Sequence, residues 1–142
     1  MSQSLAQIYI HIIFSTQRHH PFIEQAIEPE LFAYIGATIK RCKGVPFLIN
    51  GTSDHIHILS SLPRTMSLSK FIEEIKRNSS RWIKTKGNAY QKFAWQNGYG
   101  AFSVSSSRKD GVAHYIAGQK NHHRRVNCKT IWECSTVALG CV

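Results

Sequence analysis

The sequence predicts an α+β fold: a four-stranded antiparallel sheet with two helices on one face and an extra C-terminal helix available to cover the other. Segments in which every second residue is apolar indicate strands, and segments in which apolar residues recur every three or four positions indicate helices. Glycine, proline and short polar runs separate these segments. The 142 residues, 42% of them hydrophobic, suffice for one domain with a buried core. No apolar run of about eighteen residues is present to span a membrane.

The first half of the chain predicts a strand, a helix and a hairpin. Apolar residues alternate with others over 5–14, which indicates a strand covered on one face; the segment lacks the basic start of a signal peptide. A helix over about 29–42 follows, because Pro29 suits a first helical position and an apolar stripe continues from it. Two strands, 46–52 and 55–61, flank a polar turn and form the hairpin.

The second half predicts a helix, a strand and a last helix. The helix over about 67–86 begins after Ser67, a favourable N-cap. Residues 95–105 indicate a turn followed by a strand, and the last helix follows Asp110 and continues through Gly118. The order βαββαβ with an added helix is that of the ferredoxin-like (RRM-like) fold. This fold occurs in RNA binders, metal chaperones and nucleases, so function must be argued from side chains.

The chain is strongly basic, with 18 Lys and Arg against 8 Asp and Glu, a net charge of +10 and a pI near 9.8. A small domain with this charge is typical of proteins that bind a polyanion such as a nucleic acid, although a basic protein without such a partner also fits. We expect Lys76, Arg77 and Arg81, on the helix over 67–86, to contact a nucleic-acid backbone. A solvated helix face is the alternative interpretation of these three residues.

His55 and His57 lie two positions apart in the predicted strand 55–61. Side chains at i and i+2 of a strand lie on the same face, so the two imidazoles project side by side while Ile56 points into the core. Two neutral imidazoles at this spacing can bind one divalent metal ion, although two ordinary strand histidines have the same pattern. His11, on the non-core side of the first strand, is a candidate for supporting the pair.

Tyr115 and Gln119 lie one turn apart on the last helix and therefore share a face. A glutamine carbonyl oxygen can bind a hard divalent cation, so two histidines and Gln119 would form a three-point metal site with open positions. A packed tyrosine ring and a solvated glutamine would give the same spacing. His122 and His123 follow closely, and each could join the metal site or contact phosphate.

Three motifs occur in order along the chain: 53–59 (SDHIHIL), 95–105 (WQNGYGAFSVS), and Tyr115-Ile116 followed by Gln119. Together they resemble the single-tyrosine HUH transposases of insertion-sequence-200-like elements, with the REP-associated tyrosine transposases as relatives. The resemblance extends over about residues 7–123, which is most of the chain.

The resemblance implies a role for each matching residue. The metal ligands fall on His55, His57 and Gln119, the metal is Mg²⁺ or Mn²⁺, and the nucleophile falls on Tyr115. The implied activity is transposition, a DNA recombination reaction in which single-stranded DNA is cut and rejoined at hairpin-bearing element ends through a 5′-phosphotyrosine intermediate. The implied assembly is a homodimer, in which the tyrosine helix of one subunit can complete the site of the other.

Residues 1–125 are expected to form a single transposase domain, whereas 126–142 depart from the family pattern. This tail holds three of the four cysteines and almost no charge, so we expect it to be flexible or the product of a frameshift. No cysteines form a C-x-x-C pair, which argues against a zinc knuckle. We expect the protein to be cytoplasmic, with its thiols reduced.

Two other functions compete with a transposase. The chain could be a DNA-hairpin or single-strand binding protein of the same fold with weak or no catalytic activity. A two-histidine phosphoesterase would need a second H-x-T or H-x-S motif, which the sequence lacks.

Overall fold

The computed structural model describes residues 3–118 of the chain. Its strands and α-helices follow one another in the predicted order, βαββαβ and then a helix, with three short 3-10 turns between them. The elements are β1 (Tyr9–Ser15), η1 (Gln17–His19), α1 (Glu28–Arg41), β2 (Pro46–Gly51), β3 (His55–Ser61), α2 (Leu68–Lys84), η2 (Asn88–Tyr90), β4 (Gly100–Val104), η3 (Ser106–Arg108) and α3 (Lys109–Ala117).

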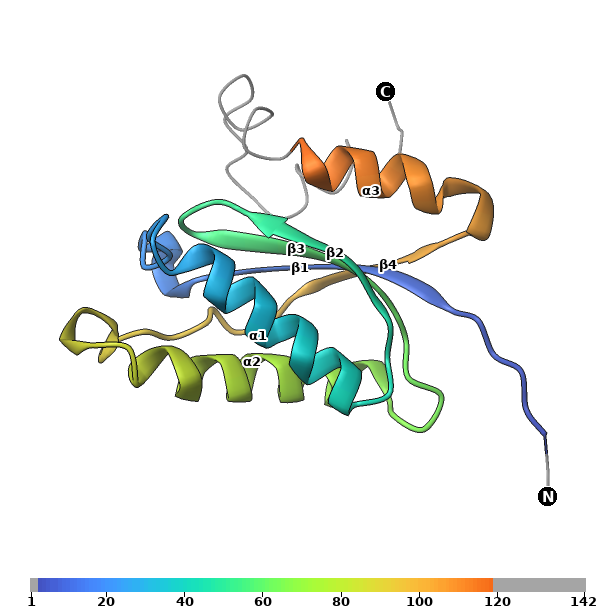
Figure 1. Ribbon diagram of the computed structural model, residues 1–142, viewed down its shortest axis with the longest axis horizontal. Coiled ribbons are helices and arrows are strands. Elements are labelled where there is room, and N and C mark those ends of the chain that lie inside the picture. The colour runs from blue at the N-terminus through green and yellow to red at the C-terminus, as the bar shows by residue number, and fades with distance from the viewer. Residues whose placement is uncertain (1–2, 119–142) are drawn as a thin grey trace.

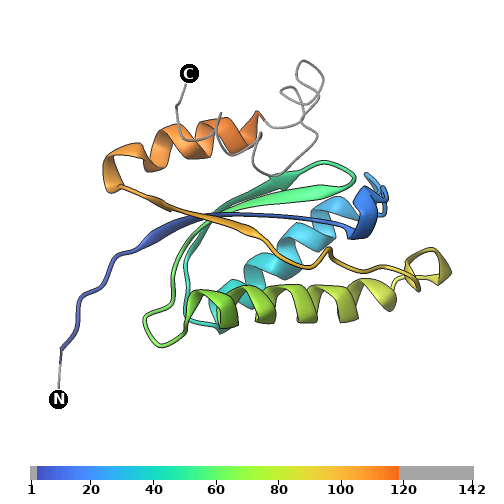
Figure 2. The same cartoon turned by 180° about the vertical axis from the view of Figure 1, so that it is seen from behind.

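The four strands form one antiparallel sheet in the order β2-β3-β1-β4. Helices α1 and α2 lie side by side beneath this sheet, and α3 crosses its other face (Figure 1; Figure 2 from behind). The predicted α+β architecture is therefore confirmed, including the extra helix over the second face. No helix within residues 3–118 is both long enough and apolar enough to cross a bilayer.

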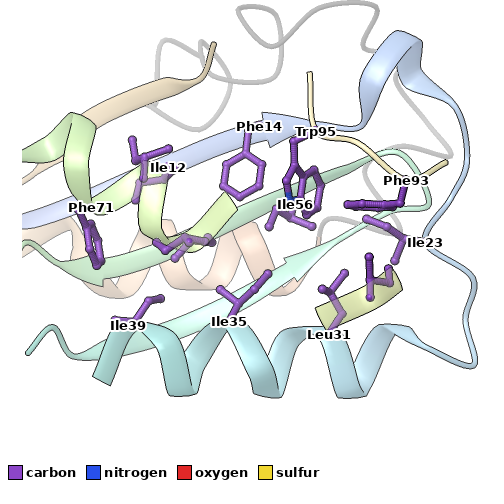
Figure 3. Close-up of a cluster of buried hydrophobic side chains, with 14 of the residues drawn as sticks. Ile12, Phe14, Ile23, Leu31, Ile35, Ile39, Ile56, Phe71, Phe93 and Trp95 are labelled. Atoms are coloured by element: carbon purple, nitrogen blue, oxygen red, sulfur yellow. The ribbon is translucent and has the colours of Figure 1, made fainter. Parts of the chain in front are cut away.

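The main core lies between the sheet and the α1–α2 layer, and the two-residue period of the strands determines which side chains enter it. Ile12 and Phe14 of β1 and Ile56 of β3 point into this layer and are fully buried (Figure 3). The Trp95 ring meets Phe14 edge to face, with ring centroids 4.7 Å apart. Its indole Nε1 donates a hydrogen bond of 2.9 Å to Ser79 Oγ, which satisfies a polar group inside the core.

A second, smaller core lies between the sheet and α3. It consists of five buried residues from three strands and the helix: Tyr9, Leu59, Val104, Val112 and Ile116. The strand members are offset by an odd number of positions from those in the main core, so they point to the opposite face. This packing places α3 over the face on which the odd-numbered residues of β1 and β3 lie.

Several element boundaries differ from the sequence-based expectation, most of them by one or two residues, and the start of the first strand and the end of the last helix have an evident cause. The first strand begins at Tyr9 and not at residue 5, because Tyr9 is already opposite Ser61 and Val104, the last residues of β3 and β4. Residues before it have no paired strand on either side. At the other end, α3 stops at Ala117 and Gly118 is its C-cap, a position that tolerates glycine well.

Candidate active site

His55 and His57 lie on the face of β3 that α3 covers. Their ring centroids are 5.3 Å apart and the rings are inclined by 71°. The side chain of His55 is 11% exposed and His57 is fully buried. The strand geometry thus brings the two imidazoles together, as their spacing predicts.

The residues just before β3 fix the orientation of the His55 ring. His55 Nδ1 lies 2.8 Å from Asp54 Oδ1 and 2.9 Å from the hydroxyl of Thr52, which itself donates to the same Asp54 oxygen at 3.0 Å. The hydrogen bond with His55 is the main cause that lowers the pKa of the Asp54 carboxyl, against an opposing effect of burial. Because an ionised carboxylate can only accept a hydrogen bond, Nδ1 of His55 keeps its proton, and the lone pair of the neutral ring is on Nε2.

His57 is oriented by His11, which lies on the neighbouring strand β1. His57 Nδ1 and His11 Nε2 are 2.9 Å apart and both rings are buried. Burial lowers the pKa of His11 to about 4, so this ring is neutral at pH 7 and can accept a hydrogen bond. When His57 Nδ1 donates to His11, the Nε2 lone pair of His57 is available to a metal.

Tyr115 reaches this pair from α3. Its ring centroid is 6.1 Å from that of His57, at an interplanar angle of 75°. The side chain is partly buried against the small core under the helix. Asn50, which is paired with His57 in the sheet, fixes the end of the helix: its Nδ2 donates to the carbonyl oxygens of Ile116 at 2.9 Å and Ala117 at 3.3 Å. Tyr115 and the histidine pair therefore meet within one chain.

The donor atoms present suit a divalent metal. Both Nδ1 atoms of the histidine pair have hydrogen-bond partners, so both rings can present Nε2, as metal-binding histidines generally do. Residues 3–118 contain no cluster of three His, Cys, Asp or Glu side chains that could hold a metal by themselves. Such a site would thus need a further donor from water, from phosphate or from another residue type. The expected third ligand, Gln119, lies outside the described residues, as do His122 and His123.

The three basic residues expected to contact DNA lie on α2, in the layer beneath the sheet. Lys76 Nζ donates to the carbonyl oxygens of Gln96 at 2.8 Å and Gly98 at 2.6 Å, and burial lowers its pKa. Arg77 forms ion pairs with Glu73 and Glu74, whereas Arg81 is exposed. Lys76 thus supports the loop before β4, and contact of these residues with DNA stays a prediction.

Sequence reasoning missed two of the supporting groups. An acidic residue directly before a histidine pair is a usable signal, and it would have identified Asp54 as the partner of His55. No comparable signal identifies Asn50. Its contact with α3 depends on the register between β2 and β3 and on the path of the chain from β4, neither of which local sequence patterns specify.

Comparisons with known proteins agree with the fold and identify a family. A family model described as "Transposase IS200 like" matches residues 4–119. No curated protein gives a significant match. A solved structure of a candidate transposase from Deinococcus radiodurans R1 is 16% identical, with a TM-score of 0.64, and the match covers 84% of this chain and 98% of that one.

A second solved structure, of a REP-associated tyrosine transposase bound to a REP hairpin, is 14% identical to this chain, with a TM-score of 0.63. This match covers 89% of this chain and 77% of that one. At these identities the two structures support the fold alone, while the family model supports family membership.

Proposed function

This chain belongs to the IS200-like transposase family, and we propose that it cuts and rejoins single-stranded DNA with Tyr115 as the nucleophile. The observation that carries this proposal is the position of the Tyr115 ring. Its centroid is 6.1 Å from the centroid of the His57 ring, on the face of the sheet where His55 also lies. A tyrosine beside a pair of oriented imidazoles has the parts that phosphoryl transfer to a protein side chain requires.

We propose that His55, His57 and Gln119 hold Mg²⁺ or Mn²⁺. When bound, such an ion would neutralise charge on the scissile phosphate and help to align the phosphorus for in-line attack. Asp54 and His11 support this role because each lies within hydrogen-bond distance of the Nδ1 of one histidine and, as the acceptor there, would direct Nε2 to the ion. His122 and His123 are further candidates for phosphate contact.

The step assigned to Tyr115 balances without a further reagent. The phenol oxygen attacks phosphorus, the bond from phosphorus to the 3′ oxygen breaks, and the phenol proton ends on that oxygen as a 3′-hydroxyl. The DNA 5′ end stays attached as a phosphotyrosine ester, which retains the energy of the broken bond. A 3′-hydroxyl from another strand end can then attack this ester, release Tyr115 and join the two strands. Covalent storage is the advantage of a tyrosine over water in such a reaction.

The proposed substrate is single-stranded DNA with a hairpin, as at the ends of an insertion element. The net charge of +10 suits a polyanion, and the second similar structure was solved with a REP hairpin. We further propose that the protein acts as a homodimer. The packing of α3 on the sheet of its own chain supports a site assembled within each subunit, whereas the family resemblance also implies exchange of this helix between subunits.

One experiment tests the proposed reaction directly. The protein is incubated with Mn²⁺ and labelled single-stranded DNA that carries a hairpin and unpaired arms, and a denaturing gel then separates covalent adducts. We expect an adduct with the wild type and with Tyr34→Phe, which removes a phenol hydroxyl from α1 on the other layer. Tyr115→Phe should form none. Hairpin binding without an adduct under any metal condition would identify the chain as a binding protein and contradict the proposal.

A further inference from the structure

A basic hollow lies at the end of the sheet where His55 begins β3. It is bounded by the loop that follows β1 and by the segment around η2, which follows α2. Its volume is about 590 Å³, within the range of ligand-binding pockets. None of its lining residues is acidic, and three are basic: Arg18, His20 and Lys92. We call this hollow the β1-loop pocket.

We propose that the β1-loop pocket binds one nucleotide of the single-stranded DNA arm next to the scissile phosphate. This inference rests on the proposed function and specifies how that function engages its substrate. The occupant must be anionic, because Arg18 and Lys92 line the pocket and neither side chain forms an ion pair within residues 3–118. Guanidinium and ammonium groups are the usual protein partners of phosphate.

An aromatic wall favours a nucleotide over a simple anion. Phe22 lines the pocket, with its ring centroid 4.2 Å from that of His20 and 5.4 Å from that of Phe93, which is buried behind it. Bases of single-stranded DNA stack on such rings whatever their identity. The amide of Gln17, which offers both donors and an acceptor, can meet the edge of a stacked base.

The loop is held in shape by hydrogen bonds of its backbone and of the Thr16 and Gln96 side chains, none of which uses a basic side chain of the pocket. Arg18 and His19 both have φ of 55°, in the left-handed region that L-residues seldom occupy. Thr16 Oγ1 donates to the carbonyl oxygens of His20 at 2.7 Å and Asp54 at 3.1 Å, and Arg18 N–H donates to Gln96 Oε1 at 3.0 Å. Preorganisation of this kind reduces the entropy lost on binding.

Asp54 connects the pocket to the histidine pair. Its backbone oxygen accepts from Thr16 N–H at 2.8 Å, which anchors the loop, and its carboxylate Oδ1 lies 2.8 Å from His55 Nδ1. The second carboxylate oxygen is 4.0 Å from Nδ1 of His19, a residue of the same loop. A nucleotide in the pocket would therefore adjoin a phosphate placed over His55 and His57, and would set the position of the strand relative to Tyr115.

The test measures binding of a fluorescein-labelled oligothymidylate that has no hairpin, by anisotropy over a range of salt concentrations. All proteins carry Tyr115→Phe and the buffer contains a chelator, so neither cleavage nor metal binding contributes. Arg18→Ala and Lys92→Ala should each weaken binding and reduce the slope of log affinity against log salt by about 0.7, the value for one lost single-strand phosphate contact. Arg64→Ala removes an exposed arginine beyond the opposite end of β3 and should leave the slope unchanged.

Phe22→Leu tests the stacked base separately. It keeps an apolar side chain against Phe93 but removes the ring, and we expect about ten-fold weaker binding with an unchanged salt slope. Equal slopes in Arg18→Ala and Arg64→Ala would overturn the pocket, because they would indicate diffuse attraction to the whole surface. Full affinity in Phe22→Leu together with weaker binding in Arg18→Ala would show that the pocket binds an anion only. That result would contradict the proposal that it binds a nucleotide.

The adduct assay separates this inference from the proposed reaction. If the wild type forms no adduct while Arg18→Ala, unlike Arg64→Ala, loses oligothymidylate affinity, the proposed reaction is wrong and the proposed pocket is supported. If the adduct forms but Arg18→Ala and Arg64→Ala have the same oligothymidylate affinity and salt slope, the proposed pocket is wrong and the proposed reaction is supported. Circular dichroism of each variant shows whether a loss of binding reflects a loss of folding.

Discussion

At the scale of single residues, the hydrogen bond between Asp54 and His55 determines which nitrogen of His55 would face the ion in the proposed metal site. Asp54→Asn removes the charge that holds the proton on Nδ1. We expect Mn²⁺ affinity to fall by about 10- to 100-fold, the usual effect of such partners, as measured by calorimetry. Asp110→Asn, which removes an exposed carboxylate from α3, should leave Mn²⁺ affinity unchanged. Equal affinities for wild type and Asp54→Asn would show that the carboxylate does not support the metal site.

His11 should make stability depend on pH. Burial lowers its pKa in the folded state to about 4, whereas the ordinary pKa of an exposed histidine is 6.5, so between these two pH values the unfolded chain binds one more proton than the folded chain. The free energy of unfolding should therefore decrease as pH falls from 6.5 to about 4, by a few kcal/mol at most, since one pKa unit corresponds to about 1.4 kcal/mol.

Chemical denaturation in metal-free buffer measures this dependence. His11→Leu should show a shallower loss of stability over the same pH range, because it removes the group that stays neutral only in the folded state. His114→Leu, which changes an exposed histidine, should behave as the wild type. The idea fails if His11→Leu and wild type lose stability in parallel.

The sequence pattern predicts which histidines share one face of the sheet, but it does not predict the contacts that orient them. Two-residue periodicity places His55, His57 and His11 on one face, because alternation is a property of each strand alone. The contact between His11 and His57 follows only from the register of β1 against β3, in which His57 is opposite Ile13. Asn50 depends in the same way on the register of β2.

At the scale of elements, the position of α3 depends on Asn50 and on the small core beneath it. Asn50→Ala removes the two hydrogen bonds to the end of the helix, and a typical hydrogen bond contributes about 1 kcal/mol. We expect adduct formation to slow several-fold and Mn²⁺ affinity to fall by less, because the histidine pair stays in place while the proposed ligand Gln119 follows the end of the helix. Asn97→Ala, in the exposed loop before β4, is the matched control and should not slow the reaction.

Hydrogen exchange distinguishes a displaced helix from a general loss of stability. In Asn50→Ala, amides of α3 should exchange faster while those of β1 and α2 keep wild-type rates. Uniform acceleration throughout the sheet would show that Asn50 supports the fold as a whole and not the tyrosine helix in particular.

Helices and the hairpin could be predicted closely, because capping and periodicity are local. Ser67 accepts a hydrogen bond from Lys70 N–H and starts α2 as expected. The start of β1 could not be predicted, since the alternation of apolar residues continues to Leu5 although no strand pairs there. Pairing partners, and not intrinsic pattern, decide where a strand begins.

At the scale of the whole molecule, the two faces of the sheet have different tasks. The α1–α2 layer buries the large core, while the α3 face carries the histidine pair and Tyr115. If each subunit holds a complete site, a mixture of Tyr115→Phe and His57→Ala proteins should form no adduct, because neither chain has both groups. Recovery of adduct in the mixture would show instead that α3 crosses between subunits, and sedimentation of the same mixture reports whether dimers form.

The small core has a further consequence for energetics. Within residues 3–118, the core between α3 and the sheet comprises five buried residues, against seventeen in the main core, so among the described residues the helix has few apolar contacts to lose if it lifts away. Burial of one aliphatic side chain contributes roughly 1.5–3 kcal/mol, so this partial opening should require much less free energy than global unfolding. Mild denaturant should accordingly abolish adduct formation while the sheet and α1–α2 remain folded. The tyrosine helix would then be a sub-global unit with its own midpoint, and the catalytic arrangement would have a thermodynamic stability distinct from that of the fold.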